Sequence, residues 1–148
     1  MKKLIYFIFA GLVLLLGYKF LTSTHQDFNE LFVDQKIICF GDSLTYGTGA
    51  SSGNDYPSLL SKMISSPVIN AGRPGDTTAS ALQRLEKDVL SYAPDIVLIT
   101  LGGNDLKNGI ATDIAFENLK MIVNLIHNQG ARVIIGGLAI PFKDGSWR

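Results

Sequence analysis

The sequence predicts an α/β domain in which helices cover both faces of a parallel β-sheet. Four short apolar segments, at residues 36–40, 67–71, 95–101 and 131–136, have the length and composition of buried strands. The segments between them carry apolar residues at spacings of three and four, which is typical of amphipathic helices. Strands that alternate with helices form parallel sheets with right-handed crossovers, and ligands bind beyond the carboxyl ends of such strands.

Each predicted helix has its own start or stop signal. The first, over Tyr56–Ile64, has Pro57 in its first turn. The second follows Asp76 or Thr77, either of which can cap it, and the third stops at Gly130. The apolar residues expected on the inward faces of the three helices are Tyr56, Leu59, Leu60, Met63 and Ile64; Leu82, Leu85, Val89 and Tyr92; and Phe116, Leu119, Val123 and Ile126.

Length and composition limit the functions open to the chain. Its 148 residues suffice for one domain with a core, and not for two. Thirteen basic and 13 acidic residues give zero net charge without a basic stripe, so we expect no nucleic-acid partner. His25, His127 and the single cysteine, Cys39, cannot supply a metal site, and we expect no metal and no cofactor. Cys39 lies inside the first predicted strand, which indicates a packing role.

The N-terminal segment has the pattern of an export signal. Lys2 and Lys3 precede a long apolar run, so residues 1–21 are interpreted as a signal peptide or as an N-terminal membrane anchor. Both interpretations stay open, because no convincing cleavage site follows the run. Residues 22–35 are expected to form a linker, and residues 36–148 a globular domain outside the cytoplasm, periplasmic, secreted or anchored to the membrane.

The first predicted strand ends in a turn that contains a serine. In Gly41-Asp42-Ser43, the serine hydroxyl would lie in the crevice and its backbone N–H near a helix N-terminus, as suits a nucleophile that also binds an oxyanion. Thr45 stands where a G-x-S-x-G nucleophile elbow has its last glycine, which argues against the ordinary α/β-hydrolase fold. On this motif alone, a helix cap is the favoured interpretation of Ser43.

Two further loops follow the second and third strands. Gly72 lets the backbone approach a ligand closely and offers an unencumbered N–H. Gly102 and Gly103 bring the third loop near the same edge, and the Asn104 amide can point at a developing negative charge. Taken singly, these are ordinary Gly/Pro and Asn-Asp turns. Together with the serine turn, the three loops form a far more specific signal than any one of them alone.

In these three loops the sequence resembles the GDSL, or SGNH, hydrolase family, named for a serine, a glycine, an asparagine and a histidine in four successive blocks. Ser43 in Gly-Asp-Ser-Leu matches the first block, Gly72 the second, and Asn104 in Gly-Gly-Asn-Asp the third. The resemblance covers residues 36 to about 141. The helix over Tyr56–Ile64 is similar to its counterpart in the arylesterase, lysophospholipase and thioesterase-like branch.

The resemblance implies a flavodoxin-like three-layer α/β/α sandwich with strand order 2-1-3-4-5. It also implies that Ser43 attacks the carbonyl of a small-molecule or lipid ester, or of a thioester, and forms an acyl-enzyme. The backbone N–H groups of Ser43 and Gly72 and the Asn104 amide would form the oxyanion hole. The residues that would support these loops are Gly41, Asp42, Gly103 and Asp105; Asp42 would not be the triad acid.

The fourth family block, Asp-x-x-His, supplies the general base and the triad aspartate, and the sequence has no match to it. His127 is expected at the opposite end of the sheet, His25 falls in the linker, and Asp144 without an imidazole makes no triad. The fifth strand and the last helix are also missing, so we expect a truncated domain whose fourth strand is an open apolar edge. Without a base for Ser43, we expect little or no esterase turnover.

Two other functions remain open from the sequence. The same fold without catalysis would be an acyl- or glycan-binding remnant. A nucleotide or phosphate binder of flavodoxin-like fold is disfavoured, because no loop reads G-x-G-x-x-G or G-x-x-x-x-G-K-[ST]. The sequence does not select among lysophospholipids, aryl esters, acyl thioesters and acetylated sugars as substrates.

Overall fold

The computed structural model describes residues 32–137. The chain divides into two compact units, Met1–Asp34 and Gln35–Arg148, and the fold is that of the second. The expected signal or anchor at residues 1–21 lies outside the described residues, as does most of the expected linker. Between residues 32 and 137, no helix has the length and apolar character needed to cross a membrane.

Four parallel strands form one sheet in the order β2-β1-β3-β4. The predicted order is 2-1-3-4-5, and the four described strands confirm its first four positions. In the register, Gly41 pairs with Gly72 on one side and with Thr100 on the other, so the loops after β1, β2 and β3 start at the same level of the sheet. The strands are β1 (Ile37–Gly41), β2 (Val68–Gly72), β3 (Ile96–Thr100) and β4 (Arg132–Ile135).

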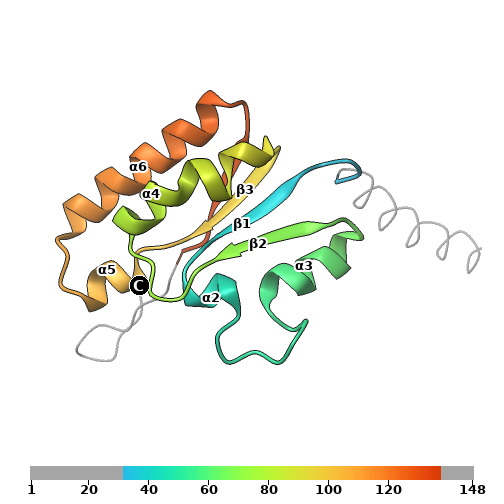
Figure 1. Cartoon of the computed structure of the whole chain (residues 1–148), viewed down its shortest axis with the longest axis horizontal. Coiled ribbons are helices and arrows are strands. Elements are labelled where there is room, and N and C mark those ends of the chain that lie inside the picture. Colours follow the sequence, from blue (N-terminus) through green and yellow to red (C-terminus); the bar gives the residue numbers. More distant parts are fainter. Residues whose placement is uncertain (1–31, 138–148) are drawn as a thin grey trace, which may run out of the picture. The chain divides into compact units, whose positions relative to one another are not determined.

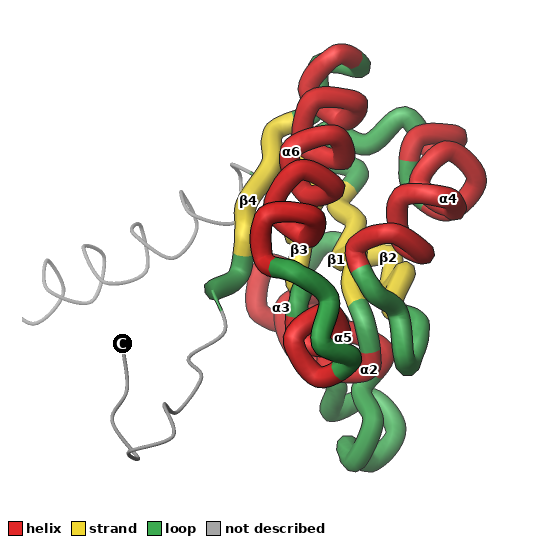
Figure 2. Tube along the Cα trace, turned by 90° about the vertical axis from the view of Figure 1, so that its left-hand side faces the viewer, coloured by secondary structure: helices red, strands yellow, loops and turns green. Residues whose placement is uncertain are grey.

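Helices lie on both faces of this sheet, as the sequence predicts. Helices α4 (Thr78–Asp88) and α6 (Thr112–Asn128) cover one face, and α3 (Tyr56–Ile64) lies on the other (Figures 1 and 2). Two short helices, α2 (Ser43–Tyr46) and α5 (Gly103–Lys107), follow β1 and β3 directly at the carboxyl end of the sheet. The described residues therefore form the expected helix–sheet–helix layers.

The core fills the space between the sheet and the pair α4 and α6. Alternate residues of the two central strands point into it, as the two-residue period of a strand requires. Burying each such side chain contributes about 1.5–3 kcal/mol, so this layer holds the two helices on the sheet. Its fully buried members include Ile38, Phe40, Val97 and Ile99 from the strands, and Ala81, Leu85, Ile122 and Ile126 from the helices.

Helix α4 begins as predicted and ends earlier than predicted. Thr77 caps it, through a capping box in which Thr77 and Ser80 each accept a hydrogen bond from the other's backbone N–H. The helix ends at Asp88, and a 3-10 turn (Leu90–Tyr92) follows. Tyr92, expected on the inward helix face, is therefore turned out and exposed.

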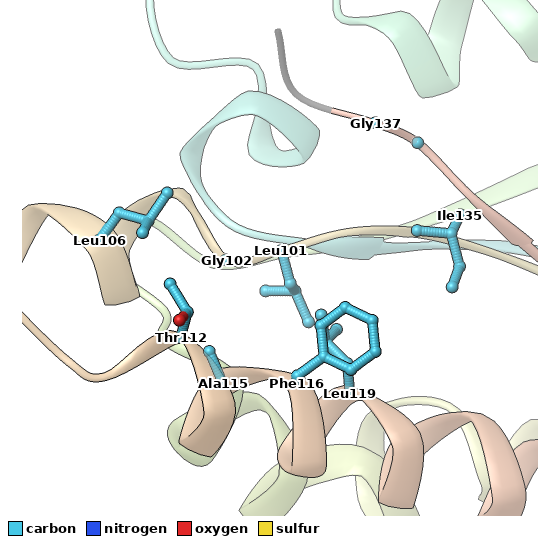
Figure 3. A pocket seen from close by; sticks show the side chains of 10 residues that line it. Leu101, Gly102, Leu106, Thr112, Ala115, Phe116, Leu119, Ile135 and Gly137 are labelled. Atoms are coloured by element: carbon cyan, nitrogen blue, oxygen red, sulfur yellow. The ribbon is translucent and has the colours of Figure 1, made fainter. Parts of the chain in front are cut away.

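Three other residues expected on inward helix faces are exposed, namely Leu59, Met63 and Phe116. Helix α3 packs against β2, a strand at the margin of the sheet, so it buries Pro57 and Ile64 and not a full apolar stripe. Phe116 is 72% exposed, and Figure 3 shows it on α6 beside Ile135 of β4, the strand at the other margin of the described sheet. Helical spacing alone therefore overestimates the buried face of helices at the margins of the described sheet.

Strand β4 forms an apolar edge in the described part of the chain. It pairs with β3 alone among residues 32–137. Ile134 is 52% exposed and Ile135 is 57% exposed, one on each face of the strand. Both faces of this edge are therefore apolar and accessible, as the sequence predicts for the fourth strand.

The thiol of Cys39 provides a test of the packing around β1. Cys39 is fully buried in the strand, and desolvation raises its pKa to about 11. At about pH 8 it stays protonated and shielded, so native protein should not react with Ellman's reagent. One equivalent should react in concentrated guanidinium chloride. Rapid labelling of the native protein would contradict this packing.

Candidate active site

Ser43 is the first residue of the short helix α2, directly beyond the end of β1. The carboxylate of Asp42 caps this helix, since its Oδ1 accepts a hydrogen bond from Leu44 N at 2.9 Å. Asp42 N also donates to the Thr100 carbonyl at 3.3 Å, which ties the turn to β3. The cap role that the motif alone favours for Ser43 therefore belongs to Asp42, and Ser43 is left partly exposed at the helix N-terminus.

Glycine at positions 41 and 72 lets α2 pack directly on the strand ends. A Cβ atom at Gly72 would overlap the backbone of Thr45 and Tyr46 in α2. A Cβ atom at Gly41 would overlap the Thr45 side chain and the Thr100 carbonyl. The turn that presents Ser43 can thus be seated against β1 and β2 only where both side chains are absent.

The N–H of Gly72 already has a partner. It donates to Oδ1 of Asn70, two residues earlier on β2, at 2.9 Å. The Asn70 side chain is also within 3.4 Å of the Asp55 carboxylate, and Asn70 is exposed. A ligand oxygen at Gly72 N would therefore have to displace the Asn70 amide oxygen. No pattern in the sequence marks Asn70 for this role.

Asn104 lies in the first turn of α5, the helix that follows β3. Gly102, which precedes α5, has φ +108°, a conformation that favours glycine. The Asn104 Nδ2 group donates to the Asp76 carbonyl at 2.8 Å, which joins the β3–α5 loop to the β2–α4 loop. An amide nitrogen has two hydrogens, so the second remains available for a ligand.

The Asp105 carboxylate anchors α5 to the start of α4. Asp105 is fully buried and accepts from Thr78 N at 2.9 and 3.2 Å and from Thr78 Oγ1 at 2.6 Å. Asn118 on α6 adds a bond to Thr78 Oγ1 at 3.1 Å. Thr78 is the first residue of α4, where the helix dipole stabilises a negative charge. The residue next to Asn104 is therefore held on α4 through Thr78, which Asn118 in turn links to α6.

The sequence pattern marks none of three polar residues beneath these loops, namely Thr78 and Arg84, which are buried, and Asn118, which is partly buried. The Arg84 guanidinium bonds the Asp76 carboxylate and the ends of β1 and β2. One signal could have found it, because Arg84 lies three residues after Ala81 on the inward face of α4. A charge at such a position is buried only where it is paired.

An imidazole suited to act as a base for Ser43 is not found at this edge of the sheet within residues 32–137. His127 is exposed in the last turn of α6, which leads into the start of β4 at the opposite end of the strands (Figure 1). His25 and Asp144 lie outside the described residues. The described groups around Ser43 thus comprise hydrogen-bond donors and the serine hydroxyl itself.

An apolar pocket of about 260 Å³ lies at the carboxyl ends of β3 and β4, on the α6 side of the sheet. Figure 3 shows Phe116 and Leu119 of α6 facing Leu101 and Ile135 across it. Ser43, Gly72 and Asn104 are not part of its lining, but Gly102, two residues before Asn104, is. The pocket therefore adjoins the β3–α5 loop and does not include the three predicted site residues.

Residues 39–147 match the family of GDSL-like lipases and acylhydrolases. The chain belongs to this family. An arylesterase of Vibrio mimicus is 34% identical to this GDSL-family chain over 116 residues, which cover 75% of the chain and 58% of that relative. Esterase TesA of Pseudomonas aeruginosa is 31% identical over the same shares. The chain thus spans less than two thirds of the length of these relatives.

Solved structures give the same family and fold. AlinE4, an SGNH-hydrolase family esterase, superposes with a TM-score of 0.70 at 34% identity, covering 76% of this chain and 63% of AlinE4. The crystal structure of TesA gives a TM-score of 0.69 at 31% identity, covering 72% and 62%. The four-stranded sheet and its helices therefore form part of an SGNH-hydrolase fold.

Substitution of Gly72 tests the close approach of α2. Gly72→Ala should lower the free energy of unfolding by about 1–3 kcal/mol, because the new methyl group forces α2 away from β2. Urea denaturation followed by circular dichroism measures the change. Gly137→Ala is the matched control, since a Cβ atom there would meet open space. Equal stabilities of the two variants would show that α2 is not seated against Gly72.

Substitution of Asp105 tests the anchor of α5. Asp105→Asn should lower the free energy of unfolding by roughly 1–3 kcal/mol. The carboxylate oxygens accept hydrogen bonds from the N–H and the hydroxyl of Thr78, whereas the asparagine would place an NH2 group, itself a donor, against one of them. Thermal and urea unfolding measure the loss. Glu86→Gln, the same change at an exposed position of α4, should shift stability by less than about 0.5 kcal/mol. A neutral Asp105→Asn would contradict the anchor.

Proposed function

We propose that this chain is a serine ester hydrolase domain in which Ser43 is the nucleophile and forms an acyl-enzyme with a carboxylic ester or thioester. One arrangement carries the proposal. Ser43 begins a helix at the end of β1, and the loops with Gly72 and Asn104 follow the two strands that flank β1. The chain also belongs to a family whose matched relatives include proteins named as esterases.

In the proposed reaction, Ser43 Oγ attacks the carbonyl carbon while its proton passes to a base. The negative charge that develops on the carbonyl oxygen is held by the N–H groups of Ser43 and Gly72 and by the free Nδ2 hydrogen of Asn104. Loss of one such donor costs about 10²–10³ in turnover. The alcohol or thiol leaves with a proton, and water then hydrolyses the acyl-enzyme.

The substrates are proposed from chemistry and from the names of relatives. A serine nucleophile with an oxyanion hole serves small-molecule and lipid esters alike. One relative from Escherichia coli, 30% identical, is named thioesterase 1, protease 1 and lysophospholipase L1. We propose an ester or thioester substrate without assigning its acyl or alcohol part.

Turnover by residues 1–148 alone is proposed to be at or near the background rate. Ser43 needs a general base within hydrogen-bond reach, and His127 is at the far end of the sheet. The Ser43 N–H and the second Nδ2 hydrogen of Asn104 would still be available to an ester carbonyl. The chain on its own would therefore hold a binding site and a nucleophile that is poorly activated.

Export of the domain is likewise a proposal that rests on residues 1–21. A basic start followed by an apolar run directs a chain out of the cytoplasm, whether or not it is later cleaved. A relative from Bacillus subtilis, 27% identical over 126 residues, is named as lipoprotein YqeF. Its name supports a location at the outer side of a membrane for this chain also.

The nucleophile can be tested by supplying the base from solution. The purified chain and Ser43→Ala should hydrolyse p-nitrophenyl butyrate equally without additive. With imidazole as an external base, the unsubstituted chain should exceed Ser43→Ala. Asn104→Ala should lose this imidazole-dependent excess. Ser52→Ala, an exposed serine of the neighbouring loop, is the matched control and should retain it.

Each result of this assay decides one part of the proposal. A Ser43-dependent rate without imidazole overturns the inactivity of the isolated chain. Absence of any Ser43-dependent rate with imidazole overturns the role of Ser43 as nucleophile.

Binding without catalysis is the second candidate, and the apolar pocket beside Gly102 favours an acyl ligand over a glycan for it. Saturable binding of octanoate, with no Ser43-dependent turnover in imidazole, would select this function.

A further inference from the structure

The Arg84 side chain is a buried cation at the centre of the candidate site. Only 8% of the side chain is exposed, and it lies on α4 beneath the loops at the carboxyl edge of the sheet. Its Nε is 2.5 Å from Asp76 Oδ2, and its Nη1 is 3.0 Å from Asp88 Oδ2. Its guanidinium also lies over the Phe40 ring, with 4.5 Å between Cζ and the ring centroid.

The remaining hydrogen bonds of this guanidinium reach the backbone of the two strands that lead to Ser43 and Gly72. Nη2 donates to the Gly41 carbonyl at 3.1 Å and to the Ala71 carbonyl at 3.0 Å. Each carbonyl shares a rigid, planar peptide unit with the N–H of the next residue. Fixing the Ala71 oxygen therefore fixes the direction of the Gly72 N–H, and fixing the Gly41 oxygen orients the peptide that enters the Ser43 turn.

The ion pair with Asp76 extends this control to Asn104. Asp76 is bound through its carboxylate to Arg84 and to Ser80 Oγ, the latter at 2.9 Å. Its carbonyl accepts the Asn104 Nδ2 hydrogen at 2.8 Å. The residue that orients the Asn104 amide is therefore itself held in place by Arg84.

We propose that Arg84 is a positioning residue for oxyanion binding, which acts by orienting the Gly72 N–H directly and the Asn104 amide through Asp76. This inference rests on the proposed function of Ser43, Gly72 and Asn104. Arg84 touches no substrate atom in this scheme. It sets the directions in which two donors from separate loops point.

The chemistry of arginine explains why this residue type is suited to the position. A guanidinium offers five N–H donors in a fixed plane, so one side chain can bind two carbonyls and two carboxylates at once. A lysine ammonium is a point charge with three donors and cannot span the same set. A buried ion pair also contributes little net stability relative to apolar packing, which makes a geometric role the better account of this one.

Nuclear magnetic resonance of the ¹⁵N-labelled chain tests the positioning without any need for activity. In Arg84→Met, the Asn104 side-chain amide should exchange with solvent about tenfold faster, and its two proton shifts should move toward those of a free amide. The Gly72 amide signal should shift as well. Arg84→Lys, which keeps the charge, should restore these signals only in part.

Lys87→Met is the matched control, because it removes a cation from an exposed position of the same helix. It should leave the Asn104 and Gly72 signals unchanged. A folded Arg84→Met with unaltered signals at both residues overturns the inference, since a merely stabilising Arg84 would change the melting temperature alone. If Arg84→Met does not fold, Arg84→Lys decides by the same criterion.

Imidazole-supported hydrolysis of p-nitrophenyl butyrate separates failure of this inference from failure of the proposed function. Where Ser43-dependent turnover is present, Arg84→Lys should lower kcat about tenfold or more with KM little changed, because donors are misaligned and not removed. An unchanged kcat despite displaced Asn104 and Gly72 signals would overturn the role in oxyanion binding. Absence of any Ser43-dependent rate refutes the nucleophile, and the spectra still decide whether Arg84 orients the two donors.

Discussion

The seating of α2 against the ends of β1 and β2 depends on two missing side chains. Gly41 and Gly72 are partners in the strand register, and α2 occupies the space that their Cβ atoms would fill. Because α2 is only four residues long, it has few interactions of its own to fix its direction. Its position comes from this close packing and from the Asp42 cap. The placement of Ser43 is therefore a property of the sheet edge more than of the helix.

Buried charged side chains hold the loops that follow β2 and β3. The Asp105 carboxylate binds the first residue of α4, while Arg84, further along the same helix, binds Asp76 and the strand ends. Helix α4 thus holds an anion at its start and supplies a cation from its interior. The loops after β2 and β3 are both fastened to it, so movement of either loop would break charged hydrogen bonds in a poorly hydrated place.

Much of this arrangement follows from the sequence, and the part that does not has a physical reason. The strands are found from short apolar runs, and the order of the four described strands agrees with the family fold. Gly72 and Asn104 are found because the one lies at the end of a predicted strand and the other just beyond the end of the next. Asn70 and Arg84 are not, because their roles depend on partners that only the folded chain brings near. Phe116 looks like a core residue by helical spacing, yet whether a helix flank is buried depends on its neighbours.

The bond between Asn70 and the Gly72 N–H has a consequence for any ligand at this edge. The donor already has a partner, since the amide oxygen of the exposed Asn70 accepts from it. A weak acceptor such as an ester carbonyl in its ground state gains little by replacing that oxygen. An oxygen that carries a developing negative charge gains more, because charge-assisted hydrogen bonds are about twice as strong as neutral ones. Asn70 would thus act as an internal competitor that filters acceptors by charge, and raises the contrast between ground state and transition state.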